Sequence, residues 1–141
     1  MQPGKRRIAM LKRVARLREV EKRQAAFKLA QAQGMQGKLA ALRDRSSELS
    51  ASYSARRDAG DGSELARQLQ FTASVEALRG HTASETAKAE QSSRTAMNHL
   101  RMAERRHEIT GETLAVQQRE EEMRLAARDG AQLARKLKRQ S

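Results

Sequence analysis

Residues 57–63 read Arg57-Asp58-Ala59-Gly60-Asp61-Gly62-Ser63 and form the strongest turn signal in the chain. Two glycines lie within three residues, with Asp and Ser around them, and this composition is typical of a turn between regular elements. The pattern predicts a hinge at 59–62, with Gly60 and Gly62 as its hinge residues.

Both flanks of this turn favour helix. Ala, Gln, Glu, Arg, Lys and Leu dominate the chain, and the single proline, Pro3, precedes every periodic segment. We therefore predict one helix over 5–58 and a second over 63–138. One alternative stays open at Gly80, because the spacing from Thr82 to Glu85 suits a capping box. A break there would give three helices.

Apolar residues in both helices recur with the spacing of a coiled coil. The seam predicted for the first helix advances in steps of three and four, and it comprises Ala25, Ala32, Met35, Leu39, Leu42, Ser46, Leu49 and Tyr53. In the second helix a residue recurs every seven positions at Met102, Ile109, Val116, Met123, Gly130 and Leu137. A neighbouring stripe comprises Leu100, His107 and Leu114.

The fold class predicted is all-α, with two long helices forming an antiparallel coiled-coil hairpin as a single domain over 1–141. Neither helix can bury its stripe alone, and the hinge allows the second helix to reverse and pack on the first. Residues near 5 would then lie opposite residues near 117, and about the last twenty residues would extend beyond the first helix. We expect such a hairpin to be monomeric when free.

The net charge of +12 is concentrated at the two ends of the sequence. Residues 1–28 contain ten Lys or Arg and two Glu, residues 130–141 contain four Lys or Arg and no acid, and residues 29–129 are neutral. An antiparallel hairpin brings both termini towards one end. We therefore expect a positive end at the termini and an apolar end near the turn, which suggests two different partners.

The sequence offers no pattern for catalysis, a metal or a cofactor. His107 follows Glu104 by three residues, but no third ligand has useful spacing, and we expect His81, His99 and His107 to be exposed helical residues. Glycines 60 and 62 lack the spacing of a phosphate-binding loop. Carboxylates such as Glu120, Glu121 and Glu122 are expected on a solvated face, and there is no Cys. We therefore predict a protein that is not an enzyme and needs no cofactor.

The basic N-terminal segment has several interpretations. Its cations could neutralise nucleic-acid phosphates, lie on an anionic membrane, contact an acidic protein surface, or serve only solubility. The large apolar residues near the turn have two interpretations: they could be core residues of the coiled coil, or those that exceed what two helices bury in one seam could form an exposed interaction site. No apolar run approaches the length of a membrane span, and we expect a cytosolic protein.

The arrangement resembles the FliJ-type family of flagellar type III export proteins and its YscO-type injectisome relatives. The resemblance covers the whole chain as architecture. Local likenesses are Gln70-Phe71 followed by Val75-Glu76-Ala77-Leu78, and the cluster Arg105-Arg106-His107-Glu108. The chain departs from the family in having no Trp in the second helix.

This resemblance implies a non-enzymatic stalk and chaperone-escort protein, cytoplasmic and peripheral to the inner-membrane export apparatus. Its partners would be the export ATPase ring, the cytoplasmic domain of the export gate, and export chaperones, with no small-molecule substrate. The ATPase-facing residues would be Arg6, Arg7, Lys12, Arg13, Arg16, Arg135, Lys136, Lys138 and Arg139. The gate-facing residues would be Leu42, Leu49, Tyr53, Phe71, Val75 and Leu78. A nucleic-acid-binding coiled coil that uses the same basic ends is the alternative.

Overall fold

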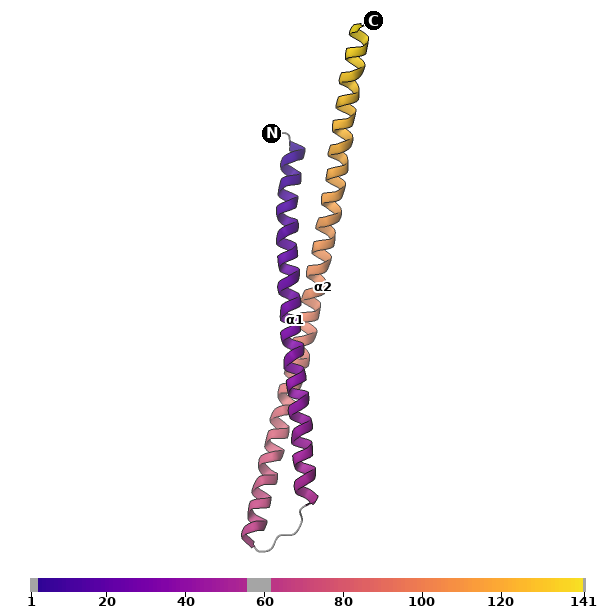
Figure 1. Cartoon of the computed structure of the whole chain (residues 1–141). Coiled ribbons are helices and arrows are strands. Elements are labelled where there is room, and N and C mark those ends of the chain that lie inside the picture. Colours follow the sequence, from indigo (N-terminus) through magenta and orange to yellow (C-terminus); the bar gives the residue numbers. More distant parts are fainter. Residues whose placement is uncertain (1–2, 56–61, 141) are drawn as a thin grey trace. The chain divides into compact units, whose positions relative to one another are not determined.

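The computed structural model describes residues 3–55 and 62–140, and every one of them is helical. Helix α1 spans Pro3–Ala55, and helix α2 spans Gly62–Gln140 (Figure 1). The two helices pack against each other, so the predicted all-α helical hairpin is confirmed. No described helix contains an apolar stretch long enough to cross a membrane.

Both helices start earlier than predicted, and the predicted end of the first helix at 58 lies outside the described residues. Pro3 is the first residue of α1, a position where proline is tolerated because that N–H has no intrahelical partner. Gly62 was predicted as a hinge residue, and this was wrong, because it is the first residue of α2. A glycine fits there since the first turn makes few of the helix's hydrogen bonds. Gly60 and the rest of 56–61 lie outside the described residues.

Helix α2 continues through Gly80 without a break, so the three-helix alternative does not apply. A Cβ added at Gly80 would meet open space, which means that the position is not a close helix contact. A lone glycine costs a helix about 1 kcal/mol, and packing along a helix of this length readily offsets that amount.

Contacts divide the chain into two compact units. Unit 1 combines residues 1–25 with 99–141, and unit 2 comprises residues 26–98. In unit 1, Glu121 of α2 lies against Gly4 of α1, and His107 pairs with Glu19. Later residues of α2 thus meet earlier residues of α1, which makes the helices antiparallel in this unit.

Unit 2 has the same antiparallel arrangement. The Tyr53 ring stacks on the Phe71 ring, with centroids 3.8 Å apart and an interplanar angle of 22°. Further along, the Ser93 hydroxyl donates a hydrogen bond of 2.6 Å to the side-chain oxygen of Gln36.

The buried seam is lined by small and polar side chains. The buried apolar residues are Ala25, Leu29, Val75, Ala89 and Ala103, and the buried polar ones are Ser46, Thr82 and Glu121. Most of these buried side chains are small, and Leu29 and Val75 are the larger apolar ones among them. The burial of little apolar area gives this hairpin a modest hydrophobic contribution to stability.

On α1, five of the eight predicted seam residues are correct. Ala25, Ala32, Leu39, Ser46 and Tyr53 are buried or half-buried. The other three are wrong, because Met35, Leu42 and Leu49 are 52%, 39% and 47% exposed. The residues that follow Met35 and Leu49, namely Gln36 and Ser50, are half-buried instead, whereas Arg43 after Leu42 is exposed. Polar residues therefore take two of the seam positions predicted for large apolar ones.

On α2, the seven-residue stripe predicted as the apolar face lies on the surface. Met102, Ile109, Val116, Met123 and Leu137 are between 42% and 72% exposed. The neighbouring stripe of Leu100, His107 and Leu114 is half-buried, together with Ala96, Thr110 and Gln117. The seam therefore follows the less apolar of two adjacent stripes, and the more apolar one is left available to another molecule.

Candidate functional site

Unit 1 carries a band of exposed cations on α1, formed by Arg6, Arg7, Lys12, Arg13 and Arg16. We call these five residues the basic band. Arg6 and Arg13 are seven residues apart, and Lys12 and Arg13 precede Arg16 by four and three, so most of the band shares one helix face. Within the described chain, no ion pair joins any of the five to a carboxylate. Their charge is therefore open to a partner.

The cations that follow on the same helix are already neutralised. Glu21 accepts a hydrogen bond of 2.9 Å from Arg18, and the Glu19 carboxylate lies 3.2 Å from Arg23 and 3.9 Å from Lys22. Positive charge on the α1 part of unit 1 thus falls into a paired segment and an unpaired one, and the unpaired segment contains the α1 residues predicted to contact an ATPase.

The second predicted basic segment lies on a part of α2 that extends past the start of α1. Pro3 and Gly4 line a pocket of about 320 Å³ with Gln117, Glu120, Glu121 and Arg124, so α1 begins at this level of α2, close to the predicted pairing with residue 117. The run from Arg135 to Arg139 comes about fourteen residues later, or roughly 20 Å further along the helix axis. All four basic residues there are exposed, namely Arg135, Lys136, Lys138 and Arg139.

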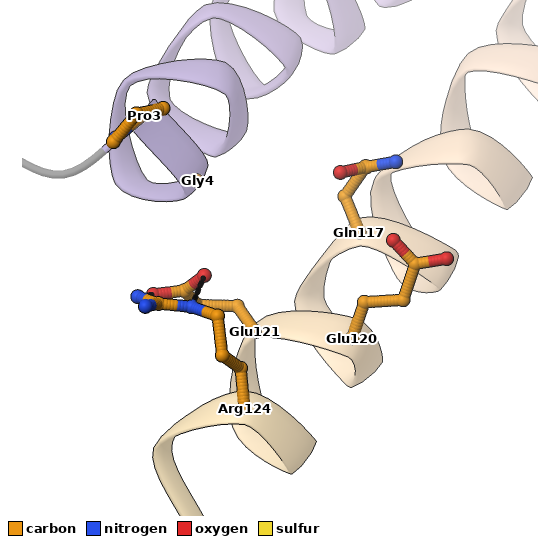
Figure 2. A pocket seen from close by; sticks show the side chains of 6 residues that line it. All are labelled: Pro3, Gly4, Gln117, Glu120, Glu121 and Arg124. Carbon is orange, nitrogen blue, oxygen red and sulfur yellow. Dashed lines mark hydrogen bonds and ion pairs between the residues drawn. The ribbon is translucent and has the colours of Figure 1, made fainter. Parts of the chain in front are cut away.

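Glu121 is the buried ionisable group at this end of unit 1. Its side chain is 11% exposed, and Arg124 donates two hydrogen bonds to it, at 2.7 and 3.2 Å (Figure 2). The pKa of Glu121 lies below its ordinary value of 4.5, mainly because of these hydrogen bonds. Burial raises the pKa, and the positive charges of Arg124 and Lys5 lower it. A Cβ added at Gly4 would overlap the Glu121 carboxylate.

This position gives Glu121 a clear physical role. The first turn of α1 contains no acidic residue of its own. The carboxylate lies beside that turn, where unpaired backbone N–H groups and the helix dipole favour negative charge. The prediction of a solvated face for Glu121 was wrong, because the residue is buried. A sequence signal for this position does exist, because Glu121 continues the series His107 and Leu114 at a spacing of seven residues.

Replacing Glu121 with Gln should lower the urea midpoint of unfolding at neutral pH. Because the folded-state pKa is lowered, the carboxylate's contribution is full above the unfolded-state value of 4.5 and is lost as the pH falls through the folded-state value. The two proteins should therefore converge in stability as the pH falls through and below the lowered folded-state pKa of Glu121. Glu122→Gln, at an exposed neighbour, is the matched control, and an equal effect of both changes at neutral pH would contradict this role.

His107 also differs from its predicted setting. Its Nε2 lies 2.9 Å from a Glu19 oxygen on the other helix, and the side chain is 37% exposed. The expectation of an exposed histidine is confirmed for His81 and His99, whereas His107 is half-buried. No group of three or more potential metal-ligating His, Cys, Asp or Glu residues occurs in the part of the chain that the structure describes.

The predicted gate-facing residues of unit 2 divide into exposed and packed ones. Leu42, Leu49 and Leu78 are 39%, 47% and 39% exposed, so each presents apolar surface to solvent. Tyr53 and Phe71 stack on one another and are half-buried. Val75 is only 8% exposed, so it packs between the helices rather than lying on a docking surface.

Two exposed surfaces of different chemistry lie among the predicted site residues. One is the basic band of unit 1, with the run at 135–139. The other is the set Leu42, Leu49 and Leu78 in unit 2, which we call the leucine patch. Comparison with known protein families, with characterised proteins and with solved structures finds no match to this chain.

Proposed function

We propose that this protein is a non-enzymatic stalk and chaperone-escort component of bacterial type III protein export, flagellar or injectisome. In this role it works in the cytoplasm at the inner-membrane export apparatus. The observation that carries the proposal is the basic band, five exposed cations that no described carboxylate neutralises. It lies on the helix where the family resemblance places the ATPase contact.

The proposed mechanism uses the two surfaces for different partners. The basic band and the cations at 135–139 dock on the ring of the export ATPase and favour assembly of its hexamer. Opposite charge across such an interface accelerates encounter and fixes the orientation of the partners more than it raises affinity. The leucine patch then contacts the cytoplasmic domain of the export gate or passes export chaperones to it.

The test is the ATP hydrolysis rate and hexamer assembly of the export ATPase from the same organism, with and without this protein. We expect the wild-type protein to stimulate both. A variant with Arg6, Arg7, Arg13 and Arg16 changed to Glu should lose the stimulation, because reversing four charges turns attraction into repulsion.

A matched control reverses the same number of charges in unit 2. Lys38, Arg45, Arg67 and Arg94 are all exposed, and changing them to Glu gives the same net charge as the test variant. Stimulation should survive in this control. Absence of stimulation by the wild-type protein, or equal loss in both variants, would refute the proposed docking.

Nucleic-acid binding is the second candidate function, and the same uncompensated cations favour it. The basic band could contact phosphates along one groove, since its members follow one helix face. In that case the logarithm of the association constant for duplex DNA should fall linearly with the logarithm of the salt concentration. The slope should be about −0.9 per phosphate neutralised. The test variant should abolish this binding, and the unit 2 control should retain it.

A further inference from the structure

Both helices of unit 1 expose large apolar side chains at a spacing of seven residues. On α1, Met10 and Leu17 are each 56% exposed, and on α2, Ile109 and Val116 are 48% and 42% exposed. We call these four residues the outer stripes. Exposed apolar residues with this regular helical spacing are typical of a surface that packs against another helix.

The two outer stripes lie at the same height on the two helices. The ion pair of His107 with Glu19 fixes the level of α2 against α1. Because the helices are antiparallel in this unit, each step forward along α1 matches one step back along α2. Leu17 is therefore level with Ile109. The other two stripe residues, seven positions away on each helix, are level with each other in the same way.

The outer stripes also lie on one side of the helix pair. On α1, a stripe residue comes directly before Leu11, the half-buried seam residue that precedes Ala15 by four. On α2, a stripe residue comes directly before the half-buried Thr110, which precedes Leu114 by four in the same way. The stripes thus occupy equivalent positions. Equivalent positions of two antiparallel helices that share a seam face the same side, because a two-fold axis normal to the plane of the helices relates them. Unit 1 therefore has one apolar face, to which both helices contribute.

The two helices that make this face carry opposite charge. Residues 4–18 of α1 contain seven Lys or Arg and no acid. The stretch of α2 at the same level, residues 108–122, contains five Glu and one Arg, and four of the five Glu are exposed. The outer stripe of α1 therefore lies among cations, and the outer stripe of α2 lies mainly among carboxylates.

We propose that a second copy of the chain covers this face, related to the first by a two-fold axis parallel to the helices. An axis across the helices would place α1 on α1 and bring the cations of both copies together. The parallel axis places α1 of each copy on α2 of the other, so that cations meet carboxylates and the outer stripes meet each other. Unit 1 then becomes half of a four-helix bundle in which every neighbouring pair consists of one α1 and one α2.

This arrangement specifies an ion pair between the copies. Arg13 and Glu112 are both exposed, and each follows a residue of its own outer stripe by three. The two residues lie at nearly the same level, on the side of each helix that points away from the shared seam. In the dimer, Arg13 of one copy lies beside Glu112 of the second copy, and the two-fold axis repeats the pair.

The dimer differs from the monomer that the hairpin alone predicts, and it does not rest on the proposed export function. It uses surface on α1 next to the basic band, so self-association and docking on another protein would compete. Each copy contributes only a few large apolar side chains. We therefore expect association at about micromolar concentrations, as for interfaces below about 1,200 Å².

Sedimentation equilibrium of the purified full-length protein, from about 1 to 200 μM, tests the dimer. We expect an equilibrium between monomer and dimer. Ile109→Ser with Val116→Ser should weaken dimerisation by roughly tenfold or more. The matched control is Leu65→Ser with Leu69→Ser, at residues of unit 2 that are 50% and 64% exposed, and it should dimerise like the wild type. A wild-type monomer over the whole range, or equal weakening by both variants, would overturn the proposal.

A charge exchange tests the placement of α1 on α2 of the second copy. Arg13→Glu and Glu112→Arg should each weaken dimerisation several-fold, and the double variant should recover the wild-type association, because the ion pair forms again with its charges exchanged. Circular dichroism of all three variants should match the wild type, since both side chains are exposed. Single changes without effect, or a double variant without recovery, would overturn this placement. No export ATPase enters these measurements, so a failure of the dimer is distinct from a failure of the export proposal.

Discussion

Ala89→Glu should destabilise the protein by about 3 kcal/mol at neutral pH. Ala89 is 7% exposed on the seam of unit 2, between the layer of Ser46 and Thr82 and the hydrogen bond of Gln36 with Ser93. A carboxylate placed there loses its hydration and gains no cation in the seam. Domains are stable by only about 5–15 kcal/mol, so this loss is a large fraction of the total. Urea unfolding followed by circular dichroism measures it.

The control for this change is Ala87→Glu, two residues away. Ala87 is exposed, so the same substitution there leaves the new carboxylate in water, and its effect should stay within about 0.5 kcal/mol. The two variants have the same composition and the same helix propensity. If their urea midpoints were equal, the helix face assigned to the seam would be incorrect.

The seam of α1 was predictable from sequence at five of eight positions, and the misses involve neighbouring residues. Met35 and Leu49 are exposed, and the residues that follow them, Gln36 and Ser50, are half-buried instead. One residue turns a helix by about 100°. Periodicity could therefore locate the shared positions Ala25, Ala32, Leu39, Ser46 and Tyr53. Hydrophobicity then favoured the wrong neighbour, because contacts between small side chains position this seam.

The candidate sites show the same limit. The basic band could be predicted because Arg6 to Arg16 form a run with no acid among them. Ion pairs could be predicted only between residues three or four apart on one helix, as for Arg18 and Glu21. The contacts of Glu121 with the start of α1 and of His107 with Glu19 join residues far apart in sequence. They depend on the register of the two helices, which a pattern within one helix does not specify.

The polar seam and the apolar surface have one physical consequence in common. Burying Ser46, Thr82 and Glu121 while exposing Met102, Ile109 and Met123 sacrifices hydrophobic stabilisation of the isolated chain. Apolar area left in water can still be buried against another protein, where it contributes about 25 cal/mol per Å² before the costs of association. Such a distribution is typical of a chain that completes its packing on a partner.

Changing Leu42, Leu49 and Leu78 to Ser should weaken binding to the cytoplasmic domain of the export gate by roughly tenfold or more. These residues form the leucine patch, and a few apolar side chains commonly carry most of an interface's binding energy. Because they are 39%, 47% and 39% exposed, the hairpin should lose much less stability than a buried substitution would cost. Calorimetric titration of the purified gate domain measures the affinity.

The matched control removes the same kind of surface from unit 1. Met102, Ile109 and Val116 are 53%, 48% and 42% exposed, and changing them to Ser removes at least as much exposed apolar character. If the gate recognises the leucine patch, this control should bind it like the wild type. Equal weakening by both triple variants would mean that the gate responds to apolar surface in general. A larger effect of the control would place the gate contact on unit 1, and the two proposed docking surfaces would then belong to one unit.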